Sequence, residues 1–152
     1  MNEKFKEVIR IIHQRLDGIK WALVGSTNMQ LQGIPIQPRD LDICVRRIDL
    51  EELKELFSDY PISNINELKP FNTEQSWEVK IIISHVEVQF FGQNDTGEYV
   101  SKLLADRIIQ IKLDDIMIPC FTLDAEEQTY AETHREQKAH LIREFLSTRR
   151  GN

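Results

Sequence analysis

The sequence predicts an α+β fold in which helices cover a mixed β-sheet. Short apolar runs with alternating polar residues, such as Val86–Phe91, are typical of strands with one buried face. Apolar residues at helical spacing begin and end the chain, in 5–16 and 135–146. Its 152 residues are the length of one domain. We therefore expect a single unit over 1–152, with a core in 1–92 and a strand hairpin and C-terminal helices in 93–152.

The first half is predicted to alternate helices and strands. In chain order we expect a helix, a strand, a short helix, a strand and a third helix, over 5–16, 21–24, 26–31, 40–45 and 50–57. Asp17-Gly18 ends the first helix, and a hydroxyl within Gly25–Asn28 is placed to cap the short one. Asp49 is placed to cap the third helix, which ends at Tyr60-Pro61.

The second half predicts two strand pairs followed by two helices. The strands are expected over 76–83 with 86–91 and over 107–112 with 116–122, and the helices over 125–133 and 135–146. Ser84-His85 joins the first pair, although tight hairpins prefer glycine or asparagine there. Gly92–Gly97 is turn-rich, and Asp114-Asp115 marks the second hairpin turn.

Composition excludes several classes of protein. A net charge of −6 and a pI near 5.3 argue against nucleic acid as a partner, because no lysine-arginine stripe is available for a phosphate backbone. Cys44 and Cys120 have no metal-ligand spacing and are expected to be buried thiols, and the four histidines also lack such spacing. The charged start and the absence of a long apolar run predict a cytoplasmic protein without signal peptide or membrane anchor.

The segment from Trp21 to Arg46 carries the chemistry. Gly25-Ser26 closes an apolar strand, and free amides at the start of a helix attract anions. Asp40 and Asp42 are two apart on a strand, so they point to one face and repel each other unless a cation joins them. Magnesium suits such oxygen ligands and completes its shell with water and substrate phosphates. The pattern predicts a metal-bound nucleoside triphosphate.

A third acid is expected on a neighbouring strand. Glu87 lies on the polar side of Val86–Phe91, where it can meet Asp40 and Asp42 without leaving the sheet. Glu78 is the substitute if the register of that strand differs. Three acids around one site would hold metal and activate an attacking hydroxyl.

These residues resemble the nucleotidyltransferase superfamily, whose fold is shared by polymerase beta and by kanamycin and lincosamide nucleotidyltransferases. The shared pattern is hydrophobic-Gly-Ser, a spacer, Asp-x-Asp and a distant acid, here Val24-Gly25-Ser26, Asp40-Leu41-Asp42 and Glu87. The resemblance covers Trp21–Phe91 and loosens toward the C-terminus. There the family often has an arginine-lysine-aspartate cluster, whereas this chain has Lys138-Ala139-His140.

The resemblance implies a metal-dependent adenylyltransferase that moves a nucleoside monophosphate, AMP from ATP, to a hydroxyl of a small-molecule acceptor and releases pyrophosphate. Asp40 and Asp42 would bind Mg²⁺, and Glu87 would be a further ligand or the general base. Gly25 and Ser26 would seat the distal phosphates. Further nucleotide contacts are expected from Asn28, Arg39 and Lys138.

Other interpretations stay open at this point. Gly25-Ser26 also fits a strand-to-helix turn without a phosphate-binding role. The two aspartates also fit acids at the edge of a strand, and Glu87 also fits an exposed residue of an edge strand. The alternative functions are a protein-modifying minimal nucleotidyltransferase of a toxin–antitoxin pair and a nucleotide-binding module without turnover. Acceptor identity depends on 62–72, 92–97 and the C-terminal helices, the last of which is also the expected interface of a homodimer.

Overall fold

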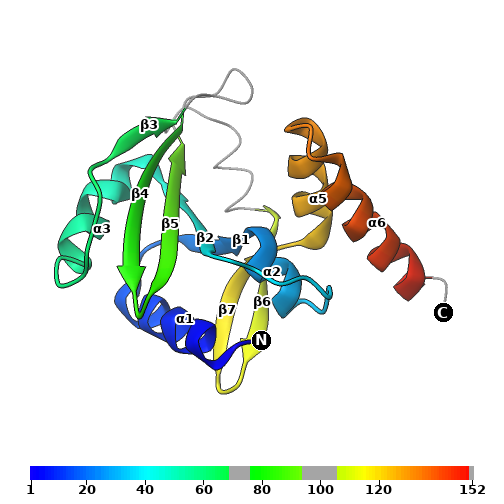
Figure 1. Cartoon of the computed structure of the whole chain (residues 1–152), viewed down its shortest axis with the longest axis horizontal. Coiled ribbons are helices and arrows are strands. Elements are labelled where there is room, and N and C mark those ends of the chain that lie inside the picture. The colour runs from blue at the N-terminus through cyan, green and yellow to red at the C-terminus, as the bar shows by residue number, and fades with distance from the viewer. Residues whose placement is uncertain (69–75, 94–105, 151–152) are drawn as a thin grey trace.

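A computed structural model describes residues 1–68, 76–93 and 106–150 of the chain. Within these residues, seven strands form one mixed sheet in the order β3-β4-β5-β2-β1-β7-β6 (Figure 1). The strands are β1 Trp21–Val24, β2 Leu41–Arg46, β3 Asn66–Leu68, β4 Ser76–Ile83, β5 Val86–Gln93, β6 Ile108–Leu113 and β7 Ile116–Phe121. The helices are α1 Glu3–Arg15, α2 Gly25–Leu31, α3 Leu50–Leu56, α5 Leu123–Glu132 and α6 Glu136–Arg150, with a short 3₁₀ helix over Arg47–Asp49. The predicted α+β class is confirmed.

The register of the central strands decides which side chains meet. β2 runs antiparallel to β1, where Val24 pairs with Asp42, and parallel to β5, where Leu41 pairs with Val88 and Asp42 with Gln89. β1 is parallel to β7, and the β4–β5 and β6–β7 pairs are the two predicted hairpins. Because partners in adjacent strands point to the same side, Asp42 and Gln89 share a face.

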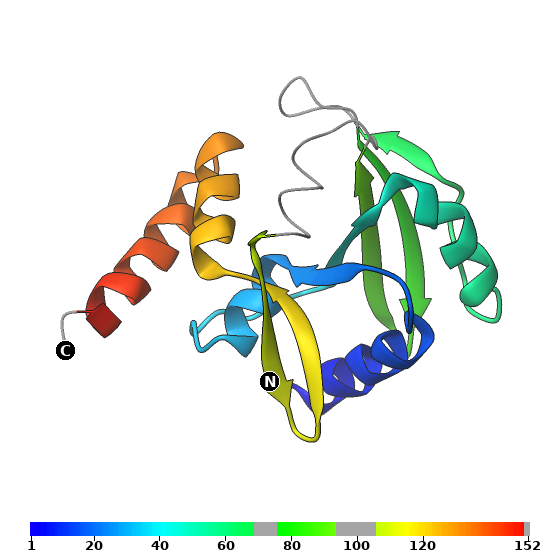
Figure 2. The same ribbon diagram turned by 180° about the vertical axis from the view of Figure 1, so that it is seen from behind.

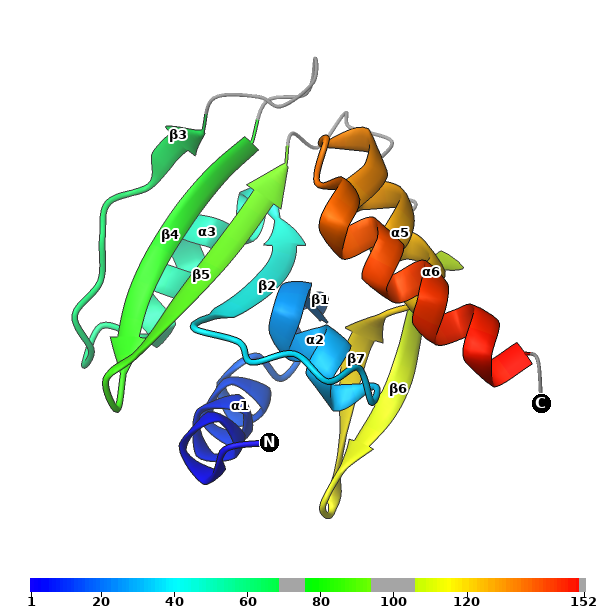
Figure 3. The same cartoon turned by 45° about the vertical axis from the view of Figure 1, so that its right-hand side comes forward.

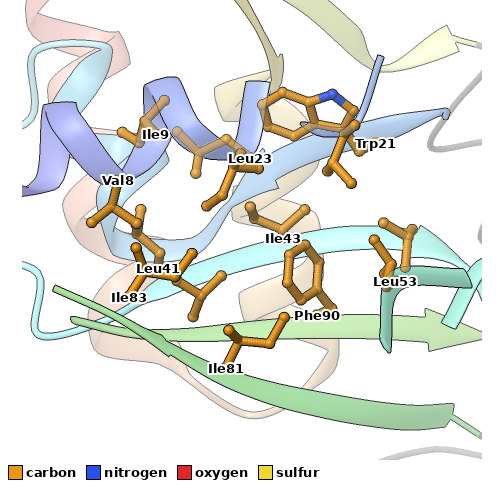
Figure 4. Close-up of a cluster of buried hydrophobic side chains, with 14 of the residues drawn as sticks. Val8, Ile9, Trp21, Leu23, Leu41, Ile43, Leu53, Ile81, Ile83 and Phe90 are labelled. Atoms are coloured by element: carbon orange, nitrogen blue, oxygen red, sulfur yellow. The ribbon is translucent and has the colours of Figure 1, made fainter. Parts of the chain in front are cut away.

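One face of the sheet is covered by α1 and α3. The apolar side of α1 is fully buried against alternate residues of β1, β2 and β5, which include Leu23, Ile43 and Phe90 (Figure 4). Asn2 caps α1 by accepting a hydrogen bond from the amide of Lys4 at 2.7 Å. This core buries one side of β2 and turns Asp42 to the other side.

The second face carries α5 and α6, which lie side by side (Figures 2 and 3). The side chain of Thr122 caps α5 by accepting from the amide of Ala125. Met29 of α2 and Ile34 of the following loop pack with apolar residues of the two C-terminal helices, namely Leu123, Tyr130, Ala139 and Ile142. A smaller cluster of Ala22, Cys44, Phe121 and Ala125 joins α5 to the sheet. The C-terminal helices are therefore held against α2.

The two cysteines are buried and free, as predicted. Burial raises the pKa of both thiols to about 12. Among the described residues, no helix has the length and apolar character needed to cross a membrane.

Both predicted side-chain helix caps are wrong. Helix α2 begins at Gly25 itself, directly after the strand, and no side chain of its own segment caps it. Asp49 precedes α3, but its carboxylate binds Arg46 at 3.0 Å instead of an amide of the helix. The side chains expected to cap these helices bind other groups instead. The Asp49 carboxylate binds Arg46, and the hydroxyl of Thr27 in α2 donates to the backbone oxygen of Asp40.

Two further details differ from the sequence prediction. The short strand β3 was not predicted. Gly92 belongs to β5, where a Cβ would lie 2.9 Å from the Cα of Arg47, so close approach and not a turn explains this glycine. The rest of the predicted turn, 94–97, lies outside the described residues.

Candidate active site

The corner between β1 and α2 lies directly against Asp42. Gly25 is buried and has a φ of +76°, a conformation that favours glycine. A Cβ at this position would lie 2.7 Å from Oδ2 of Asp42. The strand-to-helix turn thus requires glycine at position 25 for two reasons, its positive φ and the space that the Asp42 carboxylate occupies.

The three predicted acids lie on the same side of the sheet. Asp42 is on β2, Asp40 precedes that strand by one residue, and Glu87 precedes Val88, the partner of Leu41. Since side chains alternate along a strand, Glu87 points to the face that carries Asp42. The hydroxyl of Thr27 donates to the backbone oxygen of Asp40 at 2.9 Å, which ties this end of β2 to α2.

The electrostatics of Asp42 follow from its position. Burial, followed by the negative charge of Asp40, raises the pKa of Asp42 to about 6. Glu87 acts in the same direction, whereas the positive charges of Lys138 and Arg135 lower the pKa. Asp42 therefore has both acids and cations among its neighbours.

This donor set has the chemistry of a magnesium site. A carboxylate whose pKa is raised by burial and by a neighbouring acid is stabilised when a divalent cation neutralises it. In the conformation described, however, no group of three histidine, cysteine, aspartate or glutamate side chains within residues 1–68, 76–93 and 106–150 is arranged to hold an ion. Asp40 and Asp42 fit as a pair of ligands, and among the described residues no third such side chain completes a set.

Glu87 has a cationic neighbour. Its carboxylate is about half exposed and lies 3.9 Å from Nζ of Lys80, which is equally close to Glu78. Glu78, the alternative third acid, is buried four positions further along the β4–β5 pair, opposite Phe91, and accepts a hydrogen bond from Gln89. Its carboxylate is already engaged, so Glu87 is the more accessible of the two.

The C-terminal helices bring a cation to the other side of the corner. Nζ of Lys138 on α6 lies 3.3 Å from the hydroxyl of Ser26 and 5.3 Å from the ring centre of Tyr130. The hydroxyl of Tyr130 hydrogen-bonds Ser26 as well, and the guanidinium of Arg135 lies over the same ring at 5.8 Å. Two predicted nucleotide-binding residues, Ser26 and Lys138, are thus in contact despite 112 positions between them.

The remaining predicted nucleotide contacts are placed differently. Asn28 is fully buried, and its side chain donates to the backbone oxygen of Phe121 at 3.0 Å and accepts from Gln32 at 2.8 Å. Arg39 is exposed, one residue before Asp40. The amide of Gly25 donates to the carboxylate of Glu126 at 2.6 Å. The structure therefore gathers Ser26 and Lys138 beside the acids, and uses Asn28 and the Gly25 amide inside the protein.

Sequence reasoning missed three residues of this site, Glu126, Tyr130 and Arg135. Glu126 is only 3% exposed, and burial raises its pKa to about 8 even though the Gly25 amide and Asn28 act in the opposite direction. A signal was present in the sequence, because Leu123, Glu126 and Tyr130 lie at i, i+3 and i+7 on one helical face. An acid on an otherwise apolar helical face indicates a buried partner.

Comparisons with known proteins agree on the fold. No family model matches the chain, and no curated protein matches it. A candidate nucleotidyltransferase from Thermotoga maritima matches with a TM-score of 0.74 and 22% identity, over 97% of this chain and 96% of that one. ANT(2″)-Ia in complex with adenylyl-2″-tobramycin matches with a TM-score of 0.61 and 10% identity, over 95% of this chain and 91% of that one.

The solution structure of the antibiotic-resistance factor ANT(2″)-Ia gives a TM-score of 0.57 at 10% identity, over 99% of this chain and 95% of that one. At these identities the similarity concerns architecture. The chain has the nucleotidyltransferase fold, as the resemblance of its motifs predicted.

Proposed function

We propose that the chain is a magnesium-dependent nucleotidyltransferase that moves AMP from ATP to a hydroxyl of a small-molecule acceptor and releases pyrophosphate. One observation carries the proposal. Asp42 lies so close to Gly25 that a Cβ there would meet its carboxylate, and it lies next to a second acid, while Lys138 contacts the adjoining Ser26. The proposed metal ligands and the proposed phosphate-binding cation therefore adjoin the same turn, on a fold shared with nucleotidyltransferases.

Asp40 and Asp42 would hold Mg²⁺, and Glu87 would complete the ligand set. When bound, the ion supplies charge neutralisation at the triphosphate and lowers the proton affinity of the attacking hydroxyl. The ammonium group of Lys138 and the hydroxyl of Ser26 bind phosphate oxygens as donors. Glu87, which is half exposed on the same face, can accept the proton of the acceptor hydroxyl.

The proposed acceptor is a hydroxylated small molecule. One structural neighbour was solved with adenylyl-2″-tobramycin, an adenylylated aminoglycoside. The net charge of −6 favours cationic acceptors of this kind. Parts of the surface expected to select the acceptor, 69–72 and 94–97, lie outside the described residues.

Pyrophosphate release tests the proposal. The protein is incubated with each of the four nucleoside triphosphates and a panel of hydroxylated acceptors, with magnesium or with a chelator. We expect release from ATP that needs both magnesium and an acceptor. Asp42→Asn and Asp40→Ala should each lower the rate by about 100-fold or more, the effect of removing electrostatic stabilisation from such a site.

The matched control is Asp115→Asn, which removes an exposed aspartate in the β6–β7 turn and should leave the rate unchanged. If labelled ATP transfers its label to lysate proteins and not to small acceptors, the acceptor is a protein and not a small molecule. Tight ATP binding that survives Asp42→Asn, with no pyrophosphate release from the unsubstituted protein, would instead show a binding module without turnover.

A further inference from the structure

Glu126 is a buried carboxyl group that the proposed reaction leaves unused. It lies in the first turn of α5, and its Oε2 accepts a hydrogen bond from the backbone amide of Gly25 at 2.6 Å. It also hydrogen-bonds the side chain of Asn28. A single side chain thus connects the C-terminal helices to the first turn of α2, across 101 positions of sequence.

The start of α2 needs this distant acceptor because the local sequence supplies none. The residue before the helix is Val24, an apolar strand residue that pairs with Asp42 and cannot cap the helix. Gly25 is buried, so its amide would lack an acceptor if position 126 were apolar. Leaving a buried donor unsatisfied is destabilising. The Glu126 carboxyl group on this apolar helical face therefore supplies the acceptor for the Gly25 amide.

The same hydrogen bond holds the Gly25 backbone in its position beside Asp42. The Cα of Gly25 packs against the carboxylate of Asp42 so closely that no Cβ fits between them. Ser26, the next residue, contacts Lys138. A shift of the Gly25 backbone would consequently move both the proposed metal ligand and the proposed phosphate donor.

We propose that Glu126 is a positioning residue, which holds the Gly25 amide and thereby sets the affinity of the corner for the magnesium–ATP complex. Its effect on ATP rests on the proposed function. The hydrogen bond and its effect on the corner can be measured independently of any activity.

Three substitutions separate the reach of the side chain from its acidic group. Glu126→Gln keeps the length and an acceptor oxygen without the carboxyl group, Glu126→Asp keeps a carboxyl group but is one methylene shorter, and Glu126→Leu removes the acceptor. By isothermal titration with magnesium and ATP, we expect the Gln variant to bind within about twofold of the unsubstituted protein. The Asp and Leu variants should bind about 10-fold more weakly, the effect of one lost hydrogen bond.

The matched control is Glu127→Gln. Glu127 lies on the same helix but binds Arg143 at 2.7 Å, and it should leave the affinity unchanged. Glu126→Leu with unchanged affinity would overturn the inference. So would an Asp variant that binds better than the Gln variant, because the carboxyl group and not the reach of the side chain would then matter.

Hydrogen exchange of the Gly25 amide, followed by ¹H–¹⁵N NMR, separates this inference from the proposed function. Slow exchange is expected in the unsubstituted protein and in Glu126→Gln, with faster exchange in Glu126→Asp and Glu126→Leu. If the protein fails to bind ATP while Gly25 behaves in this way, the proposed function fails and the link between Glu126 and the corner stands. Rapid exchange of Gly25 in the unsubstituted protein would overturn the inference even if a variant did not fold.

Discussion

Gly25 gives the sharpest prediction at the scale of single residues. In Gly25→Ala the new Cβ would meet Oδ2 of Asp42 at 2.7 Å, and the backbone φ of +76° is strained for alanine. We expect a loss of roughly 2–4 kcal/mol in the free energy of unfolding, from strain plus steric overlap. Pyrophosphate release should also fall, because Asp42 must move. Urea denaturation and the release assay measure the two effects.

Gly18→Ala is the matched control for that substitution. Its φ is +84°, but nothing lies within 4 Å of the position that a Cβ would take. It should cost only the backbone strain, about 1–2 kcal/mol, and leave activity intact. Equal effects of the two substitutions would show that contact with Asp42 does not constrain the corner.

Individual residues also show where sequence reasoning works. The two-residue period of a strand is a local property, so the common face of Asp40 and Asp42 could be predicted, and the observed register places Glu87 on that face as well. The partner of Gly25 could not be predicted from local sequence, because Glu126 reaches it from a distant helix. The roles of these acids in metal binding and catalysis stay predictions until the variants are assayed.

At the scale of elements, the β4–β5 hairpin has a turn that its sequence does not favour. Ser84 and His85 both have positive φ, 51° and 67°, as expected for a tight turn that prefers Asn-Gly. Ser84→Asn combined with His85→Gly should therefore raise the free energy of unfolding by about 0.5–2 kcal/mol. Urea denaturation measures the gain.

Ser84→Ala with His85→Ala is the control for the turn. Alanine removes the same side chains but does not favour positive φ, so this variant should be no more stable than the unsubstituted protein. If both double variants are equally stable, the turn conformation is not what limits the hairpin.

Predicted helix and strand positions came close to the observed ones because apolar periodicity is a property of each segment. The start of α2 is the informative exception. A hydroxyl within Gly25–Asn28 was the expected cap, but the helix starts at Gly25 and its first amide is satisfied by α5. Similarly, Lys138 reaches Ser26 only because α6 packs beside α5 against α2. Element positions follow from local pattern, whereas element ends depend on what packs against them.

At the scale of the whole molecule, the buried carboxyl of Glu126 predicts how stability depends on pH. Burial raises its pKa from the ordinary 4.5 to about 8, so the folded state binds a proton that the unfolded state releases. Between these two values the free energy of unfolding falls as the pH rises, by at most about 1.4 kcal/mol per pH unit. Below about pH 4.5 both states are protonated, and the contribution is fully present.

The test compares urea denaturation of the unsubstituted protein with Glu126→Gln from pH 5 to pH 9. Glutamine does not titrate, so the stability of the unsubstituted protein should decline relative to the variant up to about pH 8 and then level off. Asp42, whose pKa is raised to about 6, also makes the free energy of unfolding fall as the pH rises, at lower pH. Because Asp42 is present in both proteins, its effect cancels in the comparison. A difference independent of pH would mean that Glu126 titrates normally.

The sequence by itself determined the α+β class, the order of the strands and helices apart from β3, and the glycine-serine corner with the aspartate pair that follows it. These are local properties, set by side-chain period and turn chemistry within one segment. Only the tertiary structure decided that Lys138 meets Ser26, that Gly25 packs against Asp42 and that Glu126 holds the Gly25 amide. The antiparallel pairing of β1 with β2 brings Gly25 to Asp42, and burial of the apolar faces of α2, α5 and α6 against one another brings the other two pairs together.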